Sequence, residues 1–126
     1  FVTFNGRGFD VPFLMLRSAI LGVSPTRDLM DGRYLYQQKD GKHIDIADQL
    51  SFYGAVARKP ALHLYCRAFG ITSPKEEGIT GDDVSALFRE GKCEDIARYN
   101  CRDIIATTHL YKKWRQYVAP RSLRSG

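Results

Sequence analysis

The stretch FVTFNGRGFDVP, residues 1–12, decides which fold the chain can adopt. Its first four residues are apolar and β-favouring, which predicts a buried strand, and residues 5–8 follow as a turn whose glycines allow backbone conformations closed to other residues. Asp10 is a suitable N-cap and Pro12 suits a first helical turn, so we predict a helix that ends at Gly22. A strand followed at once by a helix indicates an α/β domain.

Further strands and helices are predicted along the rest of the chain. An alternating segment at residues 43–46 predicts a second strand in which Ile44 and Ile46 share one face, and residues 33–37 are a short extended candidate inside a mobile surface segment. Three later stretches predict helices, near residues 60–70, after a cap at Asp82, and from about residue 94 to 118. The expected buried positions are Phe13, Leu16, Ile20 and Leu21 in the first helix, Leu62, Cys66 and Phe69 in the second, and Val84, Leu87 and Phe88 in the third.

Composition excludes several classes of protein. With 126 residues, 44% of them hydrophobic, the chain fits one globular domain and neither a disordered nor a collagen-like one. Its three cysteines include no C-x-x-C pair, which disfavours a disulfide framework or structural zinc and favours a reducing, cytoplasmic setting; we expect Cys101 to be packed. The apolar runs are too short to cross a bilayer, so we expect a soluble protein with no membrane partner.

Basic residues crowd the end of the chain, within residues 112–124. A basic end of this kind suits a polyanionic partner, whereas a solvated helix face followed by a frayed tail would have the same composition. Charge alone leaves both interpretations open.

The last predicted helix has a carboxylate in its inward stripe, at Asp103. Burying an unpartnered carboxylate costs several kcal/mol, so an arginine, backbone donors or metal ions would have to compensate. Tyr99 lies four residues earlier on the same face, so its phenol and the carboxylate can address one point in space. The alternative is a half-exposed Asp103 beside a packed tyrosine ring. The full stripe comprises Ile96, Tyr99, Asp103, Ala106, Leu110 and Trp114.

Asn-x-x-x-Phe-Asp at residues 5–10, followed far downstream by Tyr-x-x-x-Asp at residues 99–103, resembles the second and third motifs of the DEDDy-type 3′-5′ exonucleases. With the contexts at residues 43–46 and 81–84, the chain is most similar to the predicted exonucleases related to the proofreading domain of family-B DNA polymerases. The resemblance implies a ribonuclease-H-like α/β fold. Residues 1–118 would be the C-terminal portion of the exonuclease domain, with residues 119–126 as a basic tail.

The resemblance also implies a mechanism, in which two Mg²⁺ or Mn²⁺ ions promote hydrolysis at the 3′ end of single-stranded DNA. Asp10 and Asp103 would each be a metal ligand, and Tyr99 would orient the attacking water. In the turn before Asp10 we expect nucleic-acid contacts from Asn5, Arg7 and Phe9; Phe9 could stack on a terminal base and Arg7 could touch phosphate. Phe9 as a core aromatic and Arg7 as a solvated charge are the alternatives.

One family motif does not occur in the sequence: Asp-x-Glu, which would supply two further carboxylates. Because the chain also starts inside an apolar run, we expect a segment of a longer polypeptide whose early strands carry that motif, and weak metal binding by this chain alone. A catalytically inactive nucleic-acid-binding module of the same fold is the alternative. Asp45 and Asp48 could be taken as further metal ligands, but we expect them to cap an element or face solvent. We expect the three histidines, which lack metal-ligand spacing, to be on the surface or partly buried.

Overall fold

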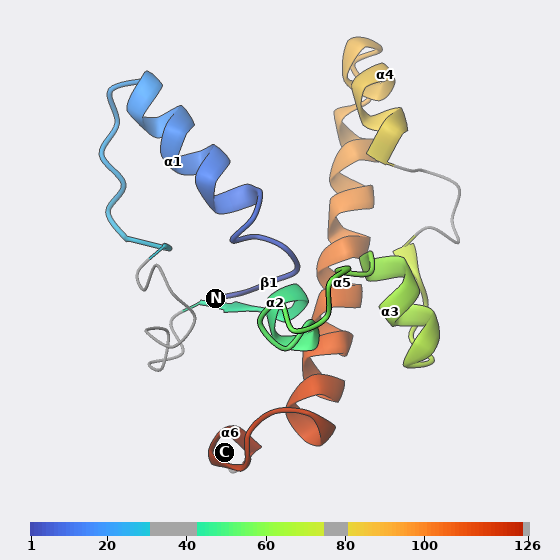
Figure 1. Ribbon diagram of the computed structural model, residues 1–126. Helices are drawn as coiled ribbons and strands as arrows, with labels where there is room; N and C mark the ends of the chain where they lie inside the picture. The colour runs from blue at the N-terminus through green and yellow to red at the C-terminus, as the bar shows by residue number, and fades with distance from the viewer. Residues whose placement is uncertain (31–42, 75–80, 125–126) are drawn as a thin grey trace. The chain divides into compact units, whose positions relative to one another are not determined.

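A computed structural model describes residues 1–30, 43–74 and 81–124, which fall into two compact units, residues 1–59 and 60–126 (Figure 1). The extended segment predicted at residues 33–37 lies outside the described residues.

The first unit contains a two-stranded parallel sheet. Strand β1 (Val2–Thr3) pairs with β2 (Ile44–Asp45), with Val2 opposite Ile44 and Thr3 opposite Asp45. The parallel pairing confirms an α/β architecture. Helix α2 (Ile46–Leu50) follows β2 without a break, so the prediction that Ile44 and Ile46 share a strand face is wrong. The carboxylate of Asp45 caps this helix, and capping ends the strand one residue earlier than its apolar alternation suggests.

Helix α1 (Asp10–Ile20) lies between the strands in the sequence and ends where predicted, with Gly22 in the left-handed region at φ 68°. Its N-cap is Phe9, so the prediction of Asp10 as the cap is wrong. The predicted buried stripe is also wrong, because only Val11 is buried and the four expected positions are exposed: Phe13, Leu16, Ile20 and Leu21. Periodicity identifies the side chains that share a helix face, but a second element must cover that face to bury it.

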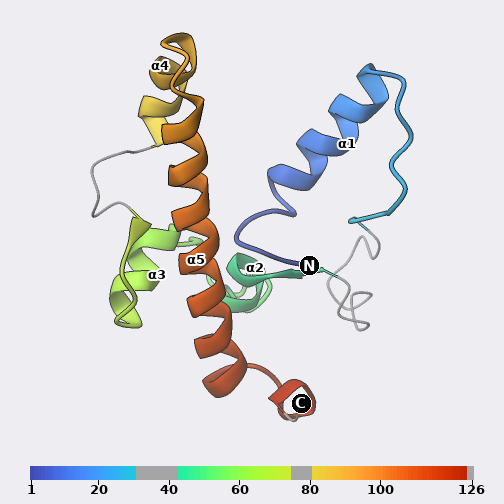
Figure 2. The same ribbon diagram turned by 180° about the vertical axis from the view of Figure 1, so that it is seen from behind.

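The second unit is helical and is organised around α5 (Cys93–Tyr117), which confirms the long helix predicted at residues 94–118. Helices α3 (Leu62–Ala68) and α4 (Val84–Arg89) pack against α5, as both views of the ribbon show (Figures 1 and 2). A single 3-10 turn, η3 (Gly81–Asp83), leads into α4, and the short α6 (Arg121–Arg124) packs near the end of α5. The C-terminal basic segment therefore includes a helical turn.

The buried residues of this unit lie towards the C-terminal half of α5. Ala106, Leu110 and Trp114 of the predicted stripe are buried, as is Cys66 of α3, whereas the other predicted positions of these two helices are half-buried. Phe88 and Cys101 are exposed, so their predicted burial is wrong. The capping prediction for Asp82 is wrong as well, because the chain makes a 3-10 turn there and Asp83 precedes α4 without a side-chain cap. A cap needs the residue directly before the first helical turn, and that turn starts later than expected.

In the part of the chain that the structure describes, no helix combines the length and the apolar character that a membrane span requires.

Candidate active site

The loop that precedes Asp10 has a defined conformation. Asn5 is in the left-handed region at φ 60°, which asparagine tolerates better than most residues. Gly6 and Gly8 were predicted to allow unusual backbone conformations, but the structure requires them because a side chain would not fit there. A Cβ on Gly6 would lie 2.6 Å from the Cβ of Thr3, and one on Gly8 would lie 2.7 Å from the Asn5 Oδ1.

The loop is joined to both the sheet and α1. The Asn5 and Arg7 amides donate to the Asp45 carboxylate, at 2.8 Å to Oδ1 and 2.9 Å to Oδ2. On the other side, the Val11 amide donates to the Gly6 carbonyl at 2.9 Å. Asp45 is therefore the structural cap that we expected, but a buried one, which bonds residues forty positions away in addition to its own helix.

Asp10 is the first residue of α1, and its side chain is exposed and makes no capping hydrogen bond. Asp10 is therefore not the N-cap residue, and its carboxylate lies in the first turn of α1, where a negative charge favours the helix. Phe9 beside it is 66% exposed and stacks on Phe13 with 6.5 Å between ring centroids, so Phe9 is not a core aromatic. An exposed carboxylate and an exposed aromatic pair thus occupy the start of the helix.

Tyr99 and Asp103, the two residues of the Tyr-x-x-x-Asp motif, lie on α5 in the second unit. The Tyr99 hydroxyl hydrogen-bonds the Asp103 carboxylate one turn further along α5, and both side chains are half-buried. Burial raises the pKa of Tyr99, and the negative charges of Asp103 and Asp82 together with the bond to Asp103 raise it further. The phenol is consequently a hydrogen-bond donor at neutral pH and not a base.

The η3 turn adds a neighbour that the sequence pattern did not indicate. A Cβ on Gly81 would lie 3.9 Å from the Tyr99 hydroxyl, and the charge of Asp82 acts on the same phenol. The signal in the sequence is Asp82, for which the pattern predicts only a helix cap. Contact with Tyr99 depends on how η3 and α4 fold back towards α5, and no local pattern encodes that.

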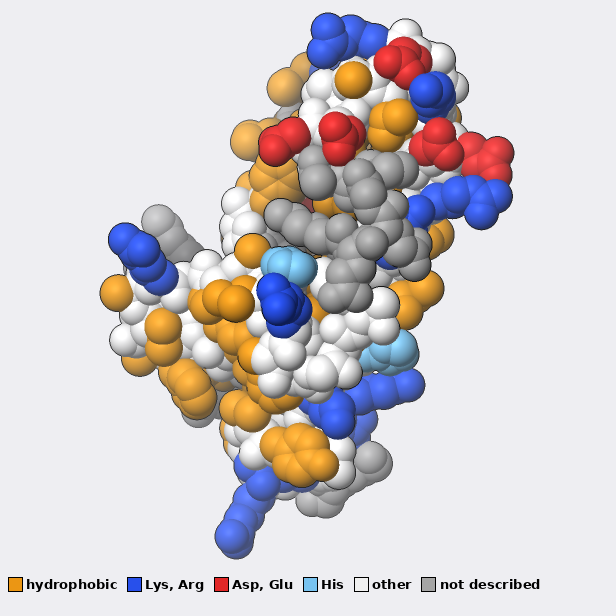
Figure 3. All heavy atoms as spheres, turned by 90° about the vertical axis from the view of Figure 1, so that its right-hand side faces the viewer, with side chains coloured by type: hydrophobic (Ala, Val, Ile, Leu, Met, Phe, Trp, Pro, Cys, Tyr) orange, Lys and Arg blue, Asp and Glu red, His pale blue; other side chains and the backbone are white. Residues whose placement is uncertain are grey.

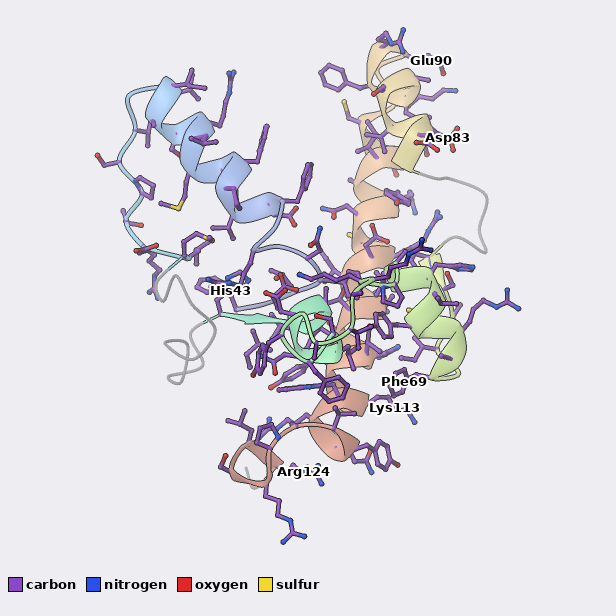
Figure 4. The ribbon with its side chains drawn as sticks, in the orientation of Figure 1. His43, Phe69, Asp83, Glu90, Lys113 and Arg124 are labelled. Atoms are coloured by element: carbon purple, nitrogen blue, oxygen red, sulfur yellow. The ribbon has the colours of Figure 1, made fainter. Side chains whose placement is uncertain are left out.

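Charge is unevenly distributed along the second unit. The labelled acidic residues Asp83 and Glu90 lie at the α4 end of α5, and Lys113 and Arg124 lie at its opposite end (Figure 4). The space-filling view shows the acidic side chains gathered at one end of this face, with basic side chains at both ends (Figure 3). Two of the basic residues stabilise the corner between α5 and α6. Arg124 donates to the carbonyls of Tyr117 and Ala119, and Arg115 donates to that of Leu123.

His43 is buried, contrary to the prediction, whereas His63 is half-buried and His109 is exposed, as expected. His43 donates from Nδ1 to the Leu29 carbonyl at 3.0 Å, so its Nε2 accepts from the Thr3 hydroxyl at 2.8 Å. His63 bonds the buried Ser73 hydroxyl at 2.5 Å. Asp48, the other acidic residue considered as a ligand, forms an ion pair with Lys59. Within residues 1–30, 43–74 and 81–124, no three His, Cys, Asp or Glu side chains group closely enough to hold a metal ion.

The two motifs lie in different units, Asp10 in the first and Tyr99 with Asp103 in the second. A family model described as a predicted 3′-5′ exonuclease related to the exonuclease domain of PolB matches residues 1–121. The chain belongs to this family. Membership confirms the family expected from the motifs, and both lie inside the matched region. No curated protein and no solved structure gives a significant match to the chain.

Family membership indicates an exonuclease-like hydrolase with a nucleic-acid substrate. The α/β architecture with its small parallel sheet is compatible with such a domain.

Proposed function

We propose that this chain carries part of the active site of a metal-dependent 3′-5′ exonuclease that acts on single-stranded DNA ends, in a ribonuclease-H-like fold. The observation that carries the proposal is the state of the two motif carboxylates. Asp10 is exposed at a helix start without acting as its cap, and Asp103 is engaged by the hydroxyl of Tyr99. Both carboxylates lie within the region matched by an exonuclease family.

The donor set suits divalent cations. Carboxylate oxygens are the hard ligands that Mg²⁺ and Mn²⁺ prefer, and Asp10 and Asp103 are the residues that would hold them. Such ions, when bound, stabilise negative charge on the attacking and leaving oxygens of a phosphodiester. Asp-x-Glu does not occur in the 126 residues, so this chain supplies two of the four carboxylates in the family pattern. We therefore expect it to bind metal weakly by itself.

The remaining side chains position the substrate. Tyr99 keeps its proton at neutral pH, so it orients the attacking water by hydrogen bonding and does not remove a proton from it. Phe9 is exposed and can stack on the terminal base, since every base has an aromatic face. Asn5 and Arg7 belong to the same loop, and we assign them contacts with the sugar-phosphate backbone.

The test is shortening of a single-stranded DNA oligonucleotide that carries its label at the 5′ end, with Mg²⁺ present and with EDTA. The assay uses this chain and the longer polypeptide expected from the sequence. In the active form, Asp10→Asn and Asp103→Asn should each lower the rate at least about a hundredfold, because a charged ligand is worth several kcal/mol of transition-state stabilisation. Asp48→Asn is the control, since that residue belongs to an ion pair with Lys59. Equal rates for wild type and Asp103→Asn would contradict the proposal.

A catalytically inactive nucleic-acid-binding module is the second candidate, and the absent Asp-x-Glu favours it. Its contact surface would include the exposed basic residues at the end of α5, such as Lys112 and Lys113. The two candidates differ in one measurement. A binding module retards the oligonucleotide in a gel with or without Mg²⁺, and it leaves the length of the oligonucleotide unchanged even in the longer polypeptide.

A further inference from the structure

We propose that Asp45 is the positioning residue of the candidate active site, because its buried carboxylate fixes the loop that presents Asp10. The exposed fraction of Asp45 is 2%, and it stands at the end of β2 directly opposite Thr3 of β1. At this point both parallel strands end and both following segments begin. The inference about Asp10 as a ligand rests on the proposed function, whereas the inference about loop geometry does not.

Three backbone amides converge on this one carboxylate. Oδ1 accepts from Asn5 at 2.8 Å and from Ala47 at 3.0 Å. Oδ2 accepts from Arg7 at 2.9 Å. A buried carboxylate is tolerated when hydrogen bonds replace its lost hydration, and here each oxygen has at least one N–H donor. Asp45 is thus bound to protein donors and is not disposed as a metal ligand.

The bonds form a continuous connection from Asp45 to Asp10. Asp45 holds the amides of Asn5 and Arg7, which flank Gly6. The Gly6 carbonyl accepts from Val11, the residue that follows Asp10 in the first turn of α1. The Gly8 amide closes the loop by donating to the Asn5 carbonyl at 3.1 Å. If the hydrogen bonds to Asp45 were lost, the start of α1 would no longer be fixed. The Asp10 carboxylate would then lose its defined orientation.

The variant that tests this is Asp45→Asn. A carboxamide keeps the shape of the side chain and one acceptor oxygen, which can still serve Asn5 and Ala47, but its NH₂ group faces the Arg7 amide in place of Oδ2. We expect backbone amide exchange at Arg7, followed by NMR, to rise about tenfold from the loss of one charge-assisted bond, while Ala47 stays protected. A general loss of structure around α2 would instead raise the exchange rate at both Arg7 and Ala47. Asp48→Asn, three residues along in the same unit, should change neither.

The second measurement is Mn²⁺ titration, followed by paramagnetic broadening of the amides next to Asp10. We expect the apparent Mn²⁺ affinity at Asp10 to fall about tenfold in Asp45→Asn, the usual range for residues that orient a ligand. Unchanged exchange at Arg7, or faster exchange at Arg7 with unchanged Mn²⁺ affinity at Asp10, would overturn the proposal. If neither this chain nor the longer polypeptide with wild-type Asp45 shows broadening at Asp10, the proposed metal-dependent function fails, and the exchange result alone decides whether Asp45 fixes the loop.

Discussion

The two halves of the motif pair, residues 5–10 in the first unit and residues 99–103 in the second, are held by contacts of different range. Asp10 depends on a loop whose amides bond a carboxylate about forty residues away in the sequence. Asp103 depends on a hydroxyl four residues earlier on the same helix. A long-range contact exists only when the sheet has formed, whereas an i, i+4 contact exists wherever the helix does. The first half should therefore respond to changes distant in sequence, and the second to changes that unfold α5 or alter Tyr99.

We expect the largest effect on stability from a change in the buried part of α5, because the local contact between Tyr99 and Asp103 requires this helix to be folded. Most of the stability of a helix in a protein comes from packing of its apolar face, and the buried residues of the 25-residue α5 lie in its C-terminal half. Trp114→Ala removes a side chain that is 2% exposed and stacks on Tyr111, and it should lower the free energy of unfolding by about 3–5 kcal/mol. Urea denaturation followed by circular dichroism measures this change.

Tyr117→Ala is the matched control for that change. It removes another aromatic ring from the same helix, but one that is exposed, so it should cost less than about 1 kcal/mol. Equal destabilisation by both substitutions would show that α5 does not depend on the burial of Trp114.

A smaller effect is expected in the long-range half, at Gly6. Gly6→Ala places a Cβ 2.6 Å from the Thr3 Cβ, and overpacking of this kind costs about 1–3 kcal/mol. Gly81→Ala serves as the control in the other half, because its Cβ would make only an ordinary contact 3.9 Å from the Tyr99 hydroxyl and should cost less than about 0.5 kcal/mol. If the two substitutions were equally tolerated in urea denaturation, Gly6 would not be required for space.

The smallest effect is a titration shift at Tyr99. Its pKa is raised chiefly by burial and then by Asp103, so Asp103→Asn should lower that pKa in part but leave it above the ordinary value of 10.0. Asp82→Asn should lower it less, since the charge of Asp82 is the weakest of the causes. Absorbance at the tyrosinate wavelength measures the shift in metal-free protein, and Tyr99→Phe identifies the signal by removing it.

The raised pKa of Tyr99 also makes the free energy of unfolding depend on pH. Because the pKa of Tyr99 is higher in the folded chain than in the unfolded one, the contribution of its protonated form is complete below about pH 10. It is lost as the pH rises through the folded-state value. A stability curve that falls equally in wild type and Tyr99→Phe above pH 10 would contradict this assignment.

Sequence reasoning was most successful for elements defined by local pattern. It predicted α5 to within a residue at each end and placed six residues on its inward face, of which the last three are buried, because helical periodicity puts those residues on one face. It failed for the apolar side chains of α1, such as Phe13 and Ile20, which share a pattern but are exposed. It also misjudged Gly6 and Gly8, where the backbone needs space and the positive φ belongs to Asn5.

The sequence by itself determined the family and the two motif carboxylates, because residue types at fixed spacing identify an exonuclease pattern without coordinates. Only the tertiary structure decided the local role of these residues. Asp10 is not the N-cap of its helix, and the amides of the loop before it donate to Asp45. Tyr99 hydrogen-bonds Asp103, and the charge of Asp82 contributes to its raised pKa. The physical reason is that hydrogen bonds and burial depend on which segments meet in space, and a linear pattern records only neighbours along the chain.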